Sequence, residues 1–200
     1  AENASLRAKD LTIQLLTFSK GGEPIRKTES IPAILKETAD FVLRGSNITS
    51  SFTIAGDLKY ADIDRSQIGQ VVHNIILNAR QAMPAGGYIS ISAENAMVDG
   101  KGSVNVKPGE YVRISIADQG VGIPANYLSK IFDPYFTTKS EGSGLGLAVS
   151  YSIIRNHDGC INVKSEPGGG TVIDLYSPAS DSEPEPEQDR DSRREPGRFN

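Results

Sequence analysis

Apolar residues recur at helical spacing in five segments of the chain. In residues 4–20 an apolar residue returns every three or four positions, which gives a heptad seam that Gly21 and Gly22 end. Such a seam is typical of a helix packed on its own domain or of one paired with another helix, and its regularity favours the paired helix. Asp64, with Gln67 three residues later, resembles a capping box at the start of a long helix. The same spacing predicts four further helices, at 31–45, 64–83, 124–132 and 148–156.

Alternating or continuous apolar runs between these helices predict strands at 48–54, 88–97, 110–117, 159–165 and 171–176. A polar, glycine-bearing loop joins the second of them to the third, and the glycines at 168–170 join the last two, so we expect antiparallel hairpins there. Helices and strands do not alternate strictly, which argues against a doubly wound sheet. The sequence therefore predicts an α/β fold, a two-layer α/β sandwich whose mixed, mostly antiparallel sheet of about five strands carries three helices on one face.

Composition changes towards the end of the chain. From residue 178 the sequence has seven acidic and four basic residues among serines and prolines, and it cannot bury a core. We therefore expect residues 178–200 to form a disordered acidic tail or linker, and residues 23–177 to form the folded domain. Removing the tail's charge of −3 from the total of −4 leaves −1, and no basic stripe indicates a nucleic-acid partner.

Cysteine content and hydropathy indicate the cellular setting. Cys160 is the single cysteine, so it cannot form an internal disulfide, and we expect it to be a small core residue at the start of a strand. No apolar run approaches the ~20 residues of a membrane span. We expect a cytoplasmic fragment without membrane contact, whether or not a longer parent protein is anchored in a membrane.

Glycines alternate with other residues just before the helix expected at 148–156. Gly142, Gly144 and Gly146 leave backbone N–H groups exposed near a helix N-terminus, and this arrangement suits a phosphate. The preceding segment is not the apolar strand of a dinucleotide fingerprint, and the lysine of a P-loop does not follow Gly146. Taken alone, the loop is equally compatible with a phosphate site and with a plain glycine-rich turn.

Two asparagines lie four residues apart on the long helix. Asn74 and Asn78 therefore project from one side of it, at the border of its apolar face, and Gln81 continues that edge one turn later. Amide oxygens suit Mg²⁺, which keeps several waters and takes further ligands from phosphates. The alternative is a pair of asparagines that only form hydrogen bonds.

Asp118 follows a predicted strand and precedes two glycines, Gly120 and Gly122. The glycines let a flat ligand approach closely. A carboxylate only accepts hydrogen bonds, so it would select an exocyclic amine such as that of adenine and repel the carbonyl of guanine. The alternative is an Asx turn, which Asp-x-Gly sequences favour.

In their order along the chain, these motifs resemble the ATP-binding catalytic domain of sensor histidine kinases, within the wider group of gyrase, heat-shock chaperone and mismatch-repair ATPases. The resemblance covers residues 25–177 and agrees with the predicted sandwich. Phe136-Thr137-Thr138-Lys139 and His157-Asp158-Gly159 are similar to the nitrogen-regulation branch of these kinases. The five motifs are Asn74-Ile75-Ile76-Leu77-Asn78-Ala79, Asp118-Gln119-Gly120-Val121-Gly122, Phe132-Asp133-Pro134-Tyr135-Phe136, Gly142-Ser143-Gly144-Leu145-Gly146 and Gly168-Gly169-Gly170-Thr171.

The resemblance implies a role for each motif. Asn78 would bind Mg²⁺, with Asn74 in the same shell, and Asp118 would hold the adenine amine. Residues 133–143 would form a mobile lid that opens for ADP to leave. Lys139 and the loop amides would meet the phosphates, so Asn78 and Lys139 are the residues expected to act in catalysis. The full nucleotide-binding set expected is Asn74, Asn78, Asp118, Gly120, Gly122, Ile123, Phe132, Lys139, Gly142, Gly144, Leu145, Gly146, Leu147 and Thr171.

The implied reaction is transfer of the γ-phosphoryl group of ATP to a histidine. Residues 11–19 look like the end of the second helix of a dimerisation and phosphoacceptor hairpin, so residues 1–22 are expected to be its remnant. Neither His73 nor His157 is followed by the pattern of an acceptor box. We therefore expect a histidine kinase fragment that uses ATP and Mg²⁺ and phosphorylates a separately supplied hairpin, but not itself.

The expected partners follow from the same resemblance. They are the hairpin of the full-length protein, a second copy in the full-length homodimer, and a response-regulator receiver domain. The acidic tail could be a free C-terminus or a linker to an attached receiver domain, and its composition slightly favours the linker.

One departure from the family pattern and three competing functions bear on this prediction. Gln81 and Ala82 stand where many sensor kinases have a basic or aromatic residue, which puts a phosphate or stacking contact from that turn in question. A hydrolytic ATPase would carry a glutamate general base at the position of Asn74, and an amide cannot take a proton. The second competing function is a protein serine kinase of the mitochondrial dehydrogenase-kinase kind, and the third is a non-catalytic nucleotide-binding or protein-binding module.

Overall fold

The computed structural model describes residues 23–100, 106–139 and 142–184. The expected hairpin remnant at 1–22 and residues 185–200 of the expected tail lie outside this part. The helices are α2 (Ile31–Leu43), α3 (Arg65–Ala82), α4 (Ala125–Leu128) and α5 (Gly146–Asn156). The strands are β1 (Lys27–Glu29), β2 (Ile48–Ile54), β3 (Tyr60–Ile63), β4 (Gly87–Val98), β5 (Gly109–Asp118), β6 (Cys160–Glu166) and β7 (Gly170–Ser180).

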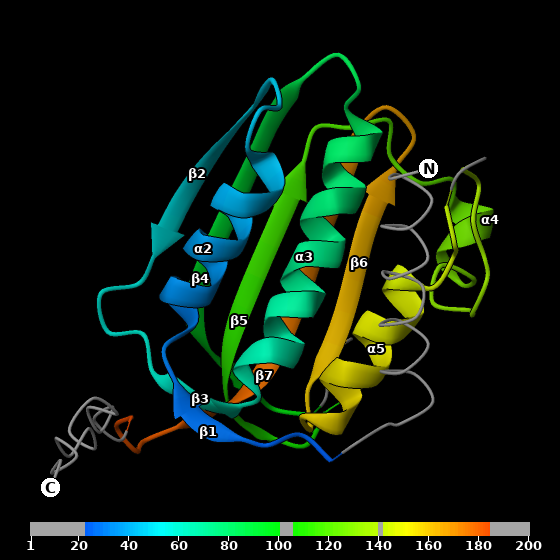
Figure 1. Ribbon diagram of the computed structural model, residues 1–200. Helices are drawn as coiled ribbons and strands as arrows, with labels where there is room; N and C mark the ends of the chain where they lie inside the picture. The colour runs from blue at the N-terminus through cyan, green and yellow to red at the C-terminus, as the bar shows by residue number, and fades with distance from the viewer. Residues whose placement is uncertain (1–22, 101–105, 140–141, 185–200) are drawn as a thin grey trace, which may run out of the picture.

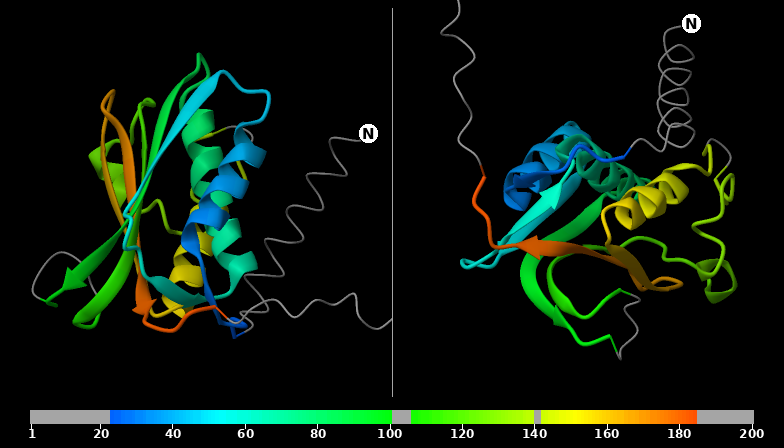
Figure 2. Two further views of the ribbon diagram at one scale, coloured as in Figure 1. Left: turned by 90° about the vertical axis from the view of Figure 1, so that its left-hand side faces the viewer. Right: turned by 90° about the horizontal axis from the view of Figure 1, so that it is seen from below.

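In the described part of the chain, seven strands form one mixed sheet. Its order is β1-β3-β7-β5-β4-β2, and β6 also pairs with β7. β2 and β4 run parallel, from Ile48 opposite Gly87 to Ile54 opposite Ala93, whereas the other five pairs are antiparallel. α2, α3 and α5 cover one face of this sheet (Figures 1 and 2). The predicted two-layer sandwich, with a mixed sheet and three helices on one face, is confirmed.

The sheet has seven strands and not about five, because two short strands escaped prediction. β1 has three residues and β3 has four, so an alternating pattern has little length in which to appear. Ala61 and Ile63 of β3 are fully buried, and this two-residue alternation was the available signal. The helix expected at 124–132 is also shorter, because α4 covers only Ala125–Leu128.

The folded domain extends beyond its expected end at residue 177. β7 continues to Ser180, with Ala179 and Ser180 opposite Ala61 and Tyr60 of β3. Asp181 follows, and its Oδ1 lies 2.8 Å from Nζ of Lys59. The first residues of the segment expected to be disordered are therefore part of the sheet.

The main hydrophobic core lies between the three helices and the sheet. Each fully buried Ile or Leu there contributes about 1.5–3 kcal/mol relative to an exposed position. Cys160 is buried, as predicted, in a smaller cluster with Val98, Tyr111 and Tyr176. No helix in the described ranges is long and apolar enough to cross a membrane. The largest fully buried side chains are Ile31, Leu35, Ile63, Ile68, Ile75, Ile76, Ile89, Ile91, Ile116, Leu145, Ile154 and Leu175.

Asp64 caps the start of α3 and also contacts His157 at the end of α5. Oδ1 of Asp64 accepts hydrogen bonds from the backbone N–H groups of Ser66 (3.0 Å) and Gln67 (3.1 Å), so the predicted cap is confirmed. The backbone N–H of Asp64 donates to Nε2 of His157 at 3.0 Å. The imidazole thus takes the place that the Gln67 side chain has in a capping box. His157 directly follows α5 and is 1% exposed.

These contacts fix the protonation state of His157. Because Nε2 accepts a hydrogen bond, the ring proton is on Nδ1, which donates to the carbonyl of Ile153 at 2.8 Å. Protonation would place a hydrogen on Nε2 against the N–H of Asp64. Burial lowers the pKa of His157 below its ordinary value. The folded protein therefore favours the neutral ring.

We predict that the free energy of unfolding falls between about pH 7.5 and about pH 5.5. In the unfolded chain His157 has a pKa of about 6.5 and takes up a proton that the folded state excludes, so its contribution is present above that pH and lost below it. The slope approaches about 1.4 kcal/mol per pH unit. Urea unfolding at about pH 7.5 and at about pH 5.5 measures this change in the free energy of unfolding. His157→Gln should lose much of this slope and the control His73→Gln should keep it, whereas an unchanged slope in His157→Gln would contradict the neutral ring.

Candidate functional site

Asn74 joins α3 to the first turn of α5. The residue is 6% exposed, and its Nδ2 donates to the carbonyl of Gly146 (3.0 Å) and to Oγ of Ser150 (3.3 Å). The hydrogen-bonding role considered for Asn74 is therefore present. Because an amide nitrogen is not a metal ligand, any contact of Asn74 with Mg²⁺ would go through its Oδ1.

Asn78 lies one turn further along α3, beside the side chain of Lys139. Its Oδ1 accepts a hydrogen bond from Nζ of Lys139 at 3.1 Å, and the same ammonium donates to Oε1 of Gln81 at 2.6 Å. Burial lowers the pKa of Lys139, and the negative charge of Asp118 opposes this shift. The lysine from the expected lid and the asparagine expected to bind Mg²⁺ are thus in direct contact.

Asp118 is the last residue of β5 and lies opposite Thr171 of β7. Its Oδ1 accepts the backbone N–H of Gly120 at 2.8 Å, which is the Asx turn considered as an alternative. The carboxylate also accepts the backbone N–H of Thr171. Burial raises the pKa of Asp118, while these two hydrogen bonds and the charge of Lys139 oppose the rise. A carboxylate has about four lone-pair sites, so the turn leaves capacity for a ligand amine.

The loop after Asp118 passes close to the end of α3 and the end of β6 at two glycine positions. The N–H of Val121 donates to the carbonyl of Ala82 at 3.2 Å. A Cβ on Gly120 would lie 2.6 Å from Cβ of Ala82, and a Cβ on Gly122, whose φ is +70°, would lie 1.9 Å from the carbonyl oxygen of Glu166. Only glycine fits at these two positions, so the loop packs directly against the ends of α3 and β6 beside the carboxylate of Asp118.

Ser165 connects two of the expected site residues, Ile123 and Thr171. Its Oγ accepts the N–H of Ile123 (2.8 Å), donates to the carbonyl of Gly170 (2.7 Å) and lies 2.9 Å from Oγ1 of Thr171. Thr171 itself is 7% exposed. Ser165 was not predictable as a site residue, because a serine on the polar side of a strand has no motif signal.

The alternating glycines bring the start of α5 against the segment that precedes them. The N–H of Tyr135 donates to the carbonyl of Gly144 at 3.0 Å. A Cβ on Gly144, whose φ is +68°, would lie 2.4 Å from the carbonyl carbon of Tyr135. The N–H of Gly142 donates to the carbonyl of Lys139 at 3.3 Å, so the loop is also tied to the lysine that reaches α3.

The first turn of α5 can accept an anion. The N-cap residue is Leu145, whose side chain forms no capping hydrogen bond. The first N–H groups of an α-helix have no partner inside the helix, and the helix dipole adds positive potential there. Gly146 and Leu147 therefore present backbone donors to a phosphate.

The apolar members of the expected set mainly stabilise the core. Phe132 and Leu147 pack against the main cluster, and the ring of Phe132 lies 5.2 Å from that of Tyr151 on α5, between centroids. Leu145 is 1% exposed. These side chains hold the loop and α5 in place, so their contribution to a ligand is positional or through the backbone.

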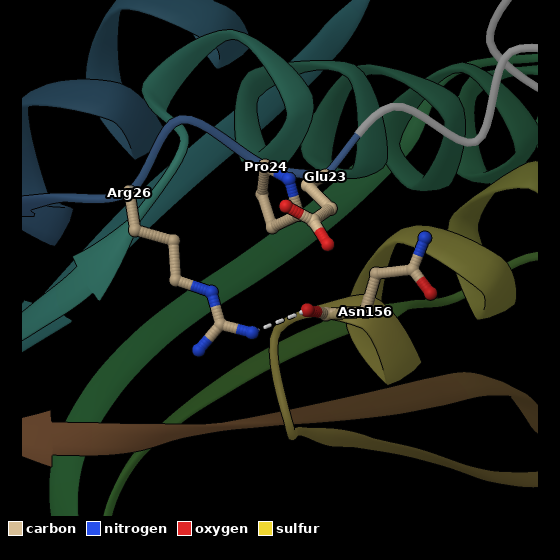
Figure 3. A pocket seen from close by; sticks show the side chains of 4 residues that line it. All are labelled: Glu23, Pro24, Arg26 and Asn156. Carbon is tan, nitrogen blue, oxygen red and sulfur yellow. Dashed lines mark hydrogen bonds between the residues drawn. The ribbon is translucent and has the colours of Figure 1, made fainter.

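A cavity of about 380 Å³ lies at the other end of α5, lined by Glu23, Pro24, Arg26 and Asn156 (Figure 3). Nη2 of Arg26 donates to the carbonyl of Asn156 at 2.5 Å. An eleven-residue helix is about 16 Å long, so this cavity is remote from Asn78 and Asp118. It lacks the glycine loop and the amide oxygens, and we do not place the nucleotide there.

The residues brought together fit a nucleotide with Mg²⁺. Asp118 can accept an amine, Oδ1 of Asn78 can bind a hard cation, and Lys139 with the start of α5 can meet phosphates. Within the described residues, no group of three or more His, Cys, Asp or Glu could hold a metal ion. The donor set therefore suits a Mg²⁺ that takes ligands from phosphates and water as well as from the protein.

The family described as histidine kinase-, DNA gyrase B-, and HSP90-like ATPase matches residues 63–181. This range contains every residue of the candidate site. The chain therefore belongs to this ATPase family.

Known relatives narrow the class further. Sensor kinase CckA of Brucella abortus is 35% identical over 184 residues, or 88% of this chain, and sensor histidine kinase ZraS of Escherichia coli K12 is 33% identical over 184 residues, or 90% of this chain. The chain spans 19% of the first relative and 37% of the second. The solved catalytic domain of histidine kinase ThkA is similar at 29% identity and a TM-score of 0.64, over 77% of this chain and 95% of that domain.

We predict that Gly170→Ala destabilises the protein more than Gly168→Ala. Both glycines have a positive φ, +79° and +76°, but a Cβ on Gly170 would lie 2.0 Å from the carbonyl oxygen of Asp118, whereas one on Gly168 meets nothing within 4 Å. The control should cost about 1 kcal/mol for its backbone conformation alone, and Gly170→Ala about 3 kcal/mol. Thermal unfolding measures the difference. Equal losses in the two variants would show that β7 does not approach Asp118 so closely.

Proposed function

We propose that the chain is the ATP-binding catalytic domain of a sensor histidine kinase, and that it transfers the γ-phosphoryl group of ATP to a histidine on a separate hairpin domain. The observation that supports this most is the contact of Lys139 with Asn78, together with the charge interaction of Lys139 with Asp118 and the contact of α3 with the uncapped start of α5. Two relatives named sensor kinases, aligned along 88% and 90% of the chain, support the same class.

In this proposal the chain acts by positioning and by neutralising charge. Asp118 accepts the adenine amine, while Gly120 and Gly122 let the ring lie against backbone. Oδ1 of Asn78, with Asn74 beside it, would hold Mg²⁺, which when bound would draw negative charge from the phosphate oxygens. Lys139 and the N–H groups of the glycine loop hold the phosphates for attack by the acceptor imidazole.

Asn74 argues against a hydrolytic ATPase. A general base at this position would need a carboxylate, but the amide donates from Nδ2 to the carbonyl of Gly146 and to Ser150. A carboxylate has no hydrogen to donate there and would face a carbonyl oxygen. The contact of Asn74 that joins α3 to α5 therefore uses an amide, and an amide cannot act as the general base that activates water.

The proposed partners belong to a longer protein. We propose that the hairpin forms a homodimer carrying the acceptor histidine and that a response-regulator receiver domain takes the phosphoryl group from it. The proposed location of the reaction is the cytoplasm. The residues from 182 onward would serve as a linker or a free tail.

The proposed reaction is tested by incubating the chain with γ-labelled ATP, Mg²⁺ and the hairpin domain of the full-length protein. We expect label on the hairpin, none on the chain itself, and little free phosphate. Asn78→Ala should reduce transfer about tenfold or more, because losing a metal contact costs at least that much, whereas the exposed Asn126→Ala should not. Free phosphate without labelled hairpin would instead indicate a hydrolytic ATPase, and nucleotide binding with neither product would indicate a non-catalytic module.

We predict that the parent chain prefers ATP to GTP and that Asp118→Asn reduces this preference. A hydrogen bond to a charged group contributes about 2 kcal/mol, so ATP affinity should fall about 30-fold while GTP affinity changes little. Asp174→Asn, the same substitution at a buried residue of β7, controls for loss of folding. Calorimetric titrations with both nucleotides measure the effect, and equal affinity of the parent for ATP and GTP would contradict the role of Asp118.

A further inference from the structure

The ammonium of Lys139 lies between two amide oxygens of α3. It donates to Oδ1 of Asn78 at 3.1 Å and to Oε1 of Gln81 at 2.6 Å. Gln81 follows Asn78 by three residues, so the two amides project from the same side of the helix. The shorter of the two hydrogen bonds is the one to Gln81.

Oδ1 of Asn78 is also the atom to which the proposed function assigns Mg²⁺. A magnesium ligand lies about 2.1 Å from the ion, and the ammonium lies 3.1 Å from the same oxygen. A divalent ion and an ammonium so close to one another would repel each other. Lys139 must therefore leave Asn78 before Mg²⁺ can bind there.

Gln81 can hold Lys139 and still release it when Mg²⁺ binds, because the side chain of Gln81 is neutral. Its amide oxygen accepts the ammonium without binding it as tightly as a carboxylate would. A basic residue at this position, as the family pattern often has, would repel Lys139. Arg80, in the same turn of α3, is held away from Lys139, because its Nη1 donates to the carbonyl of Val42 on α2 at 2.7 Å.

We propose that Gln81 is a positioning residue that holds Lys139 on α3 in the nucleotide-free protein, and that the ammonium occupies the place of Mg²⁺ at Asn78 until magnesium and nucleotide displace it. This inference rests on the proposed function, because it needs Mg²⁺ to bind at Asn78. Displacement frees the positive charge of Lys139 from α3, so that the arrival of the metal releases the lysine to the phosphates.

The test measures the affinity for ADP by calorimetry, with and without Mg²⁺. ADP lacks the γ-phosphate, so the measurement reports the cost of releasing Lys139 from Asn78 more than any gain of a new phosphate contact. Gln81→Ala weakens the hold on the lysine, and we expect it to tighten binding of ADP with Mg²⁺ about threefold to tenfold. This is less than the effect expected at Asp118, because the contact between Lys139 and Gln81 is exposed to solvent. Without Mg²⁺ the ammonium need not leave Asn78, so the gain should disappear.

Two further variants test whether the change in ADP affinity depends on Lys139. In a Lys139→Met background, Gln81→Ala should no longer change the affinity, because no ammonium is left to hold. Gln67→Ala, the same substitution near the start of α3, should leave the affinity unchanged. In nitrogen-resolved NMR spectra, Lys139→Met should also shift the side-chain amide signals of Gln81 and Asn78.

The outcomes separate this inference from the proposed function. If the parent binds ADP with Mg²⁺ and Gln81→Ala changes its affinity equally with and without Mg²⁺, or equally with and without Lys139, the inference is overturned and the proposed function stands. If Lys139→Met leaves both side-chain amide signals in place, the contact itself is contradicted. If the parent binds no nucleotide, the proposed function fails and the inference fails with it.

Discussion

The buried amide of Asn74 is the contact on which the geometry of the candidate site depends. Its Nδ2 donates to the carbonyl of Gly146 and to Oγ of Ser150, and so holds the first turn of α5 against the middle of α3. This contact places the helix start expected to bind phosphate beside the helix that carries Asn78. An unpaired buried amide costs about 1–3 kcal/mol, so the helices are strongly disfavoured from separating here. At the other end of α5, His157 joins the helix to the start of α3, so α5 is held against α3 at both of its ends.

The opposite wall of the site is made of backbone. Asp118 ends β5 with its carboxylate held by the N–H groups of Gly120 and Thr171, and the loop that follows passes where a Cβ would overlap Ala82 or Glu166. Glycine is required on these steric grounds. Close packing of this loop against α3 and β6 therefore fixes the backbone beside the carboxylate to which adenine binding is proposed.

Periodicity was sufficient to predict most of the fold from the sequence. The helices at 31–43, 65–82 and 146–156 follow apolar spacing, and five of the strands have runs long enough to be seen. β1 and β3 were missed because three or four residues are too few for an alternating pattern to show. The end of the domain was placed too early because Pro178 and the acidic residues after it resemble a tail, whereas Ala179 and Ser180 still pair with β3.

The candidate site was predictable as a set of residue types but not as a set of contacts. Asn74, Asn78 and Asp118 stood out by spacing and by neighbouring glycines. Nothing in the sequence connected Lys139 with Gln81, which lie 58 residues apart, or Ser165 with Ile123, which lie 42 apart. Such contacts arise from the tertiary fold, where the path of the loop and the register of the sheet decide which side chains meet.

The central claim is that a nucleotide binds between α3, the end of β5 and the start of α5. The most direct measurement is a titration of the isotope-labelled chain with ADP and Mg²⁺, followed by the backbone amide signals in NMR spectra. The account predicts the largest shifts at Gly120, Gly122, Gly146 and Thr171. Shifts that gather instead around Arg26 and Asn156, at the remote end of α5, would contradict it.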